Sequence, residues 1–201
     1  ERMRATIEKD AASNVEEGLI EVYKKLRPSE PPTVDSAQTH INNLFFDPGR
    51  YDMSRVGRYK YNKKLGIANR LEGQVLAEPI ANPRTGEVMA LRDEKITKEK
   101  AFEIENAGVK IAYVKAADET IVKVISNGMV DIACYVDFDA EAECDIKENV
   151  RFDVLCEILD SCENEDDLKE MLRSRADELV PNHITVDDIF ATINYLNCVA
   201  H

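Results

Sequence analysis

The chain has 201 residues, a hydrophobic fraction of 44% and a net charge of −13, which suits one domain of ordinary size or two small ones. No apolar run is long enough to cross a bilayer, and the charged opening ERMRATIEKD is unlike a signal peptide. The sequence begins without a methionine and stops just after a helical pattern. We therefore expect a piece of a longer chain.

The five cysteines are odd in number and irregularly spaced, which argues against a full disulfide framework. None forms a C-x-x-C pair, and the spacing of Cys156 and Cys162 is unlike that of zinc ligands. We expect free thiols in a reducing cytoplasm and no metal site.

Charge is distributed unevenly along the chain. Residues 50–70 carry seven basic side chains against one acid, whereas residues 137–178 carry sixteen acids against five bases. Only the basic segment could approach phosphates, because the acidic segment would repel them. The acidic segment is interpreted as a solvated face.

Residues 1–65 have the pattern of helices separated by short breaks. Ser13 and Glu16 predict a capping box for the first clear helix. Pro28 should end this helix, since a residue that precedes proline is pushed out of the α region. The prolines that follow predict a rigid extended connector. The apolar face of the helix is formed by Val15, Leu19, Val22, Tyr23 and Leu26.

Two more helices are expected before the pattern changes. Thr33 should cap a helix, and a turn follows at residues 47–49. A third, strongly basic helix is predicted from Ser54 to about Leu65. The apolar face of the second helix is formed by Ala37, Ile41, Leu44 and Phe45.

From about Leu71 the pattern becomes that of strands. Residues 74–91 read as two β segments around a hairpin-type loop at residues 82–86. Thr97 should cap a short helix that stops at Gly108, a suitable left-handed residue. Three further stretches are rich in Val and Ile and predict strands: 109–115, 121–126 and 129–138.

Helices return in the last third. One acidic helix carries Phe152 and Leu159, and a second should be capped by Asn164. Pro181 closes this section. Thr185 should cap a last helix, whose inner face is expected to hold Ile189, Ile193 and Leu196.

These elements predict an α+β fold in which a helical host carries an insertion. The host comprises residues 1–70, with the N-terminal helices, and residues 182–201, with the C-terminal return helix. The inserted module, residues 71–181, is β-rich and is followed by the two acidic helices.

Two contiguous segments resemble a known family. Residues 24–37 read KKLRPSEPPTVDSA and residues 43–65 read NLFFDPGRYDMSRVGRYKYNKKL. Both are similar to the lobe region of bacterial RNA polymerase β subunits, as is ITVDDIFATINYL at residues 184–196. The middle module is similar to lineage-specific insertions at this place, and residues 73–115 also resemble the hybrid-barrel units of the large polymerase subunits.

The resemblance implies part of a DNA-directed RNA polymerase, a nucleotidyltransferase that uses two Mg²⁺ ions. In that family the β′ subunit binds the metal, so we expect no cofactor and no catalytic residue in this segment. Asp137 and Asp139 look like a paired-carboxylate site but lack the flanking glycines and third aspartate of the polymerase motif. We interpret them as a surface strand end.

Partners and location follow from the same resemblance. The expected partners are the β′, α and σ subunits together with promoter and downstream DNA, in the cytoplasm at the nucleoid and away from membranes. The lobe walls one side of the DNA channel, and the isolated segment should be inert.

By resemblance, Arg27 and Arg50 face DNA, because a guanidinium can grip phosphate bidentately or stack on an unpaired base. The alternative for each is a structural ion pair, with Glu30 or with Asp52. Arg58 and Lys60 on the third helix are further candidates for contact with nucleic acid, and the alternative for both is that they only form the solvated side of that helix. The candidates for base stacking are Tyr51, Tyr59 and Tyr61, although aromatic residues at such positions more often belong to the core.

A second hypothesis comes from a different class of function. The acidic insert would be mainly a module that docks a transcription factor or another polymerase subunit. This hypothesis requires an exposed apolar patch on the insert, whereas the DNA-channel hypothesis requires exposed Arg27 and Arg50.

Overall fold

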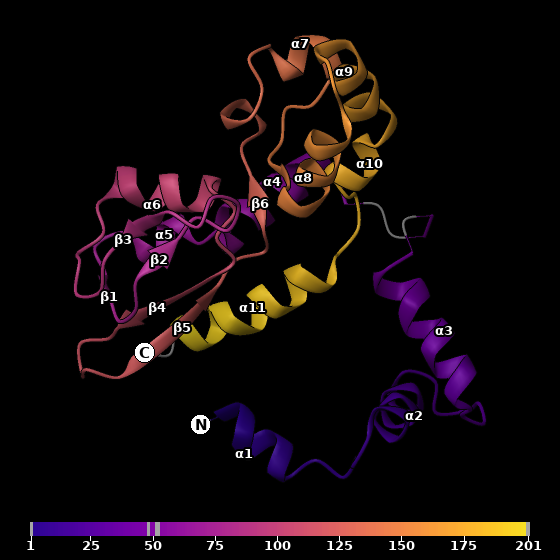
Figure 1. Cartoon of the computed structure of the whole chain (residues 1–201). Helices are drawn as coiled ribbons and strands as arrows, with labels where there is room; N and C mark the ends of the chain where they lie inside the picture. The colour runs from indigo at the N-terminus through magenta and orange to yellow at the C-terminus, as the bar shows by residue number, and fades with distance from the viewer. Residues whose placement is uncertain (1, 48, 51–52, 200–201) are drawn as a thin grey trace. The chain divides into compact units, whose positions relative to one another are not determined.

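The computed structural model describes residues 2–47, 49–50 and 53–199 (Figure 1). The chain divides into two compact units, which we call the first unit (Glu1–Asp52) and the second unit (Met53–His201). The predicted boundaries near residues 70 and 181 concern an insertion and stay a prediction. Packing divides the chain elsewhere, at residue 52.

The first unit consists of three helices: α1 (Arg2–Glu8), α2 (Val15–Leu26) and α3 (Val34–Phe45). The predicted break after α2 and the cap at Thr33 are confirmed. The predicted cap at Ser13 is wrong by one residue, since Asn14 accepts the hydrogen bond from the Glu17 amide at 2.9 Å.

Helices α2 and α3 pack on each other through little apolar surface. Tyr23 and Ala37 are the buried hydrophobic residues of the first unit within the described part of the chain. The Tyr23 ring meets His40 edge-on at 5.7 Å. Other members of the predicted apolar faces remain exposed, and the following are more than one third exposed: Val15, Val22, Leu26, Leu44 and Phe45.

The second unit contains three small antiparallel sheets. In the largest, β4 (Ile111–Lys115) lies between β1 (Val75–Leu76) and β5 (Ile121–Ile125). The predicted hairpin forms β2 (Ile80–Ala81) and β3 (Val88–Ala90). The third sheet pairs β6 (Met129–Val130) with β7 (Val150–Arg151). The α+β class is confirmed, and no sheet closes into a barrel within the described ranges.

Helices surround these sheets. Near the sheets lie α4 (Arg55–Leu65), α5 (Ala68–Leu71) and α6 (Lys98–Asn106). The acidic part holds α7 (Ala140–Cys144), α8 (Phe152–Ser161), α9 (Glu165–Ser174) and α10 (Ala176–Leu179). The last helix, α11 (Val186–Val199), runs along β5, as Figure 1 shows.

The predicted strand at residues 129–138 is wrong beyond Val130. Asp131 accepts a hydrogen bond from the Ala133 amide at 3.0 Å and starts a short 3-10 helix (Ile132–Cys134). A side chain that bonds its own backbone two residues on competes with the strand ladder. The chain therefore turns into the acidic part at this point.

Two hydrophobic cores form in the second unit. The first lies around the β1-β4-β5 sheet and α6, with Leu76 and Ile104 fully buried. The second lies under α8 and α9, with Leu155 and Leu172 fully buried. Gly108 joins them, because a Cβ at this left-handed residue (φ +82°) would lie 2.5 Å from the Phe152 ring. The predicted left-handed glycine is confirmed.

The predicted inner face of α11 is wrong at two of its three residues, since only Ile189 is half-buried. Ile193 and Leu196 are 38% and 65% exposed, whereas Asp188, Ala191 and Asn194 are buried. Asn194 explains the difference, since its side chain accepts from the Ile125 amide at 2.7 Å and donates to the Lys123 carbonyl at 2.7 Å. Helix α11 thus presents a polar face to the edge of β5.

Candidate nucleic-acid interface

Arg27 lies at the end of α2, where the proline-rich connector begins. Its Nη1 is 2.8 Å from Glu30 Oε1, and the two side chains are 48% and 45% exposed. Glu30 also accepts from the Tyr23 hydroxyl at 2.6 Å. These two donors, Tyr23 first, lower the pKa of Glu30. The ion-pair alternative is thus observed, but only one of the nitrogens of the guanidinium is bound to Glu30.

Arg50 has the most exposed side chain of the three predicted arginine contacts. Its side chain is 66% exposed, and its Nε lies 3.4 Å from Asp47 Oδ2. The alternative partner, Asp52, lies outside the described residues, as does Tyr51. A pair at this distance on an exposed loop contributes little, so the Arg50 guanidinium is accessible to an anion.

Arg58 is not on the solvated side of α4, and that prediction is wrong. The residue is 1% exposed, and its Nη1 lies 2.8 Å from Asp188 Oδ2 and 3.0 Å from Asp188 Oδ1. Its Nε donates to the Pro181 carbonyl at 3.0 Å, and its Nη2 donates to the His183 carbonyl. A guanidinium occupied in this way has no open face for phosphate, so we do not retain Arg58 as a contact.

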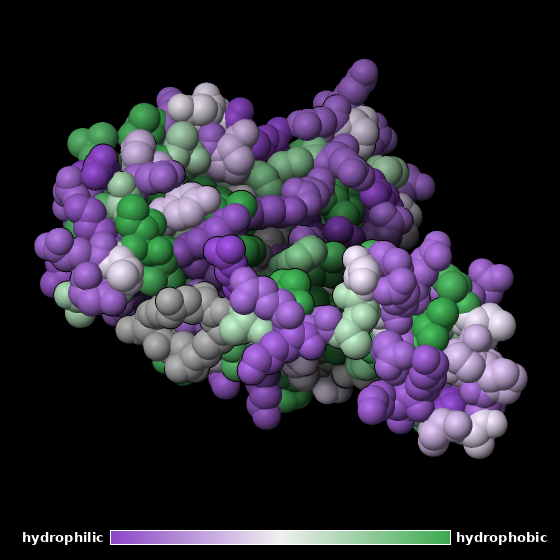
Figure 2. Space-filling model, turned by 90° about the horizontal axis from the view of Figure 1, so that it is seen from below, coloured by the Kyte–Doolittle hydropathy of each residue, from purple (hydrophilic) through white to green (hydrophobic). Residues whose placement is uncertain are grey.

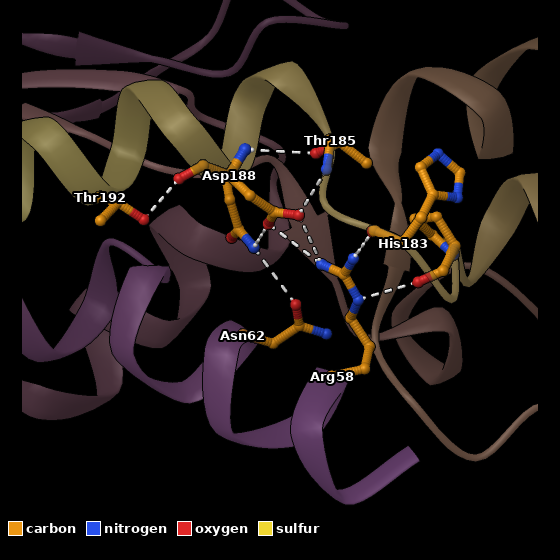
Figure 3. A network of polar contacts seen from close by, with 8 residues as sticks. Arg58, Asn62, His183, Thr185, Asp188 and Thr192 are labelled. Carbon is orange, nitrogen blue, oxygen red and sulfur yellow. Dashed lines mark hydrogen bonds and ion pairs between the residues drawn. The ribbon is translucent and has the colours of Figure 1, made fainter. Parts of the chain in front are cut away.

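Asp188 collects donors from several elements, as Figure 3 shows. Besides Arg58, it accepts from the Asn127 amide at 3.0 Å and from the Thr185 backbone amide at 3.0 Å. Asn127 also donates to Asn62 Oδ1 on α4 at 3.2 Å. A buried charge is tolerated when it is paired and its remaining lone pairs are satisfied. This cluster therefore joins α4, α11 and the chain after β5.

A second polar cluster lies near it. Arg70 Nη1 donates to Asn194 Oδ1 at 3.0 Å, and Nη2 donates to the Leu65 and Ile125 carbonyls at 2.8 and 2.6 Å. Burial lowers the pKa of this guanidinium. Two of the seven basic residues in the 50–70 segment are therefore structural, and the surface charge is smaller than the sequence predicts.

The outer surface of α4 keeps the rest of its charge. Lys60, Lys63 and Lys64 are exposed, and Lys64 Nζ lies 5.6 Å from the Tyr195 ring centre. Tyr59 and Tyr61 are 59% and 36% exposed, so the core interpretation does not hold for either. Lys60 is exposed, as predicted, on the basic surface of α4, and the exposed Tyr59 and Tyr61 flank it in the sequence.

Sequence reasoning missed Asp188, Asn127 and Asn194, which organise the two clusters. No local signal marks their role, because the long-range partners of these three residues are 61 to 130 positions away in the sequence. Hydrophilic residues also cover most of the face seen in Figure 2. Exposed charge alone therefore does not single out a site.

Other kinds of site find no support in the described part of the chain. No group of three or more His, Cys, Asp or Glu residues there could hold a metal ion. The cysteines that the structure describes are free. No helix among the described residues is long and apolar enough to span a membrane.

Comparison with known proteins gives the family. No family model matches the chain. Over 195 residues, 97% of its length, the chain is 50% identical to the DNA-directed RNA polymerase subunit beta of Clostridioides difficile, 51% to that of Clostridium novyi and 52% to that of Clostridium botulinum. It covers 16% of each of these relatives.

Exposed arginines in the first unit and exposed lysines on α4 define a class of protein segment that can contact an anionic partner. The identity over nearly the whole chain then specifies it: the chain belongs to the RNA polymerase β subunits and matches a segment of one.

Proposed function

We propose that this chain is part of the lobe that walls the DNA channel in RNA polymerase, and that it contacts DNA through Arg27, Arg50 and Lys60. The assembled enzyme would include β′, α and σ and would act on promoter and downstream DNA at the nucleoid. Its Mg²⁺ ions would be bound by another subunit, so the segment alone would not catalyse nucleotide transfer.

The observation that carries this proposal is the accessibility of the two arginines. Both are about half exposed or more, and each is bound to a single acid by one nitrogen. An arginine fork keeps several donors free in that state, which suits bidentate contact with phosphate. By contrast, Lys169 lies 2.7 Å from Glu165, and the Arg173 Nε donates to the Glu143 carbonyl at 2.8 Å.

The experiment compares variants in an assembled polymerase. Arg27→Ala and Arg50→Ala should each shorten the lifetime of the promoter complex, cost on the order of 1 kcal/mol and reduce the salt slope by about one unit. Lys169→Ala and Arg173→Ala are the controls, because carboxylates surround them. Complexes of normal lifetime and salt dependence in both arginine variants would show that the arginines are structural ion-pair partners.

The docking alternative requires an exposed apolar patch on the insert. Within residues 71–181 the exposed large hydrophobic residues are Val88, Leu91, Phe102, Ile111 and Ile121. None lies in the acidic stretch, residues 137–178, as far as the structure describes exposure there. An acidic surface without an apolar patch is sufficiently explained as a solvated face.

A further inference from the structure

A cavity of about 230 Å³ opens on the second unit between α4, α6 and the chain before β7. The residues that matter for the argument are Tyr59, Asn62, Lys63, Phe102, Glu105 and Glu148. The cavity is distinct from the Arg58–Asp188 pair, although Asn62 belongs to both surroundings. Its size suits one small planar group and excludes a base pair.

Two aromatic rings form the apolar part of the lining. Tyr59 on α4 is 59% exposed and Phe102 on α6 is 40% exposed. Large rings are normally withdrawn from water, and neither belongs to a hydrophobic core of this unit. Exposed rings beside lysines are the stacking platforms that proteins use for unpaired bases.

One side-chain donor in the lining is bound to no other residue of the described chain. Asn62 is 8% exposed, and its Oδ1 accepts from Asn127 (Figure 3). Its amide nitrogen forms no hydrogen bond to any residue that the structure describes. This nitrogen is not among the buried polar atoms without a partner, which in the described part of the chain are Asn127 Oδ1 and His183 Nδ1, so it is open to water or to a ligand in the cavity. The cavity thus offers a fixed N–H group to an acceptor.

Two carboxylates complete the polar part. Glu105 accepts from the Ala68 backbone amide at 2.8 Å, and burial raises the pKa of its carboxyl. The Glu148 side chain is 11% exposed and lies 3.7 Å from Arg55 Nε. Each carboxylate has lone pairs left to accept from an amino group. A donor and acceptors that line one cavity complement a base that carries an exocyclic amino group next to a ring acceptor.

Helix α4 supplies the positive charge that the phosphate group of a bound nucleotide would contact. Lys60 and Lys63 are exposed and form no ion pair with any acid in the described ranges, while Lys63 also lines the cavity. The phosphodiester of a strand whose base entered the cavity would meet these two ammonium groups. Electrostatic attraction of this kind does not depend on the base.

We infer that this cavity is a binding site for one unpaired nucleotide of a DNA strand. The base stacks against Tyr59 and Phe102, bonds to Asn62 and the carboxylates, and carries an amino group, as in adenine or cytosine. The adjoining phosphate lies on Lys60 and Lys63. This inference rests on the proposed function, since it requires that DNA reach the second unit.

The test titrates the full chain with five-nucleotide homopolymers of deoxyadenylate, deoxycytidylate and thymidylate at low salt, by fluorescence anisotropy. Because thymine has no amino group, we expect about tenfold weaker binding of the thymidylate strand. In nuclear magnetic resonance spectra, the Asn62 side-chain amide should shift with the first two strands and stay in place with the third.

Variants separate stacking from charge. Tyr59→Ala with Phe102→Ala should weaken the adenylate and cytidylate strands by about tenfold and remove the preference. Both rings are exposed, so the fold should survive, and a thermal melt checks this. Lys60→Gln with Lys63→Gln should weaken all three strands alike. Tyr61→Ala is the matched control, because Tyr61 is on the same helix but does not line the cavity, and its binding should be unchanged.

Equal affinity for the three strands, or an unshifted Asn62 amide, would overturn the nucleotide site. So would ring variants that bind as the wild type does. These results would leave the DNA-channel proposal standing, because that proposal is tested by Arg27 and Arg50 in the assembled enzyme. Conversely, suppose that the arginine variants form normal promoter complexes while the full chain still binds the strands base-selectively. The nucleotide site would then stand, and the proposed DNA contacts of Arg27 and Arg50 would be refuted.

Discussion

The first and second units are both rich in helices, yet they differ in what holds them together. The second unit buries two hydrophobic cores and two polar clusters. The first unit buries Tyr23 and Ala37 in its described part and leaves much of the apolar face of α2 and α3 exposed. An amphipathic sequence pattern thus predicts a helix in both units, but it does not predict whether the apolar face of that helix is buried.

The two units also differ in how far their ion pairs are exposed to solvent. Arg27–Glu30 and Arg58–Asp188 have the same shortest separation, 2.8 Å. The first is half exposed, and the side chains of the second are 2% and 1% exposed. Water screens the first pair and is excluded from the second, so the same separation should have very different consequences for stability.

The largest expected effect is the loss of the buried pair. Arg58→Ala leaves Asp188 buried without its cation and should lower the free energy of unfolding by about 3–5 kcal/mol. Arg27→Ala, the matched control, should cost less than about 1 kcal/mol. Urea denaturation, combined with hydrogen exchange to locate the loss in residues 53–199, measures both. Equal costs for the two variants would contradict the comparison.

A smaller effect is expected where the two cores meet. Gly108→Ala forces a side chain into a left-handed residue, at about 1–2 kcal/mol, and drives its Cβ into the Phe152 ring, at about 1–3 kcal/mol. Gly73→Ala is the control, because Gly73 has φ +77° but nothing within 4 Å of the added Cβ. The difference between the two melting temperatures isolates the packing cost. Indistinguishable variants would show that the Phe152 ring moves aside freely.

His183 gives the second unit a modest pH dependence. Burial, and next the nearby Arg58 charge, lower the pKa of His183, so folding favours the neutral imidazole. Its contribution to stability is present above the ordinary value of about 6.5 and is lost as the pH falls through the lowered value. The urea midpoint should therefore drop between pH 7.5 and 5.5, and less so in His183→Gln. An unchanged drop in this variant would assign the effect to other groups.

The smallest effect is expected in the first unit. Val22→Ser and Leu44→Ser replace side chains that are 46% and 39% exposed, so each should change the unfolding free energy of this chain by no more than about 0.5 kcal/mol. Leu155→Ser, at a fully buried position of the second unit, is the contrasting control and should be severely destabilising. A cost above 1 kcal/mol for either first-unit variant would mean that its apolar face is covered.

Local signals in the sequence predicted local features well. The caps at Thr33, Thr97 and Asn164 are confirmed, as is the cap at Thr185, which accepts from the Asp188 amide. Each depends on a hydrogen bond between residues two or three apart, which the sequence displays directly. The sequence therefore located most helix starts and the left-handed glycine at the end of α6.

Long-range polar contacts could not be predicted in the same way. Arg58 lies in a basic segment and Asp188 in the acidic first turn of a helix, so each looks like a solvent-facing residue. Their burial depends on meeting each other, and no periodicity reports that. For the same reason the sequence predicted the wrong buried face for α11, where the polar Asn194 is buried and the apolar Leu196 is exposed.

The separation of Arg58 and Asp188 along the chain also has a consequence during protein synthesis. The two residues are 130 positions apart. Ribosomes add roughly 5–20 residues per second, so Asp188 is made roughly 7–26 s after Arg58. Throughout that interval α4 carries a guanidinium that is costly to bury without its carboxylate. The second unit thus closes around this pair only when α11 leaves the ribosome, whereas the N-terminal caps of α2 and α3 join residues three positions apart.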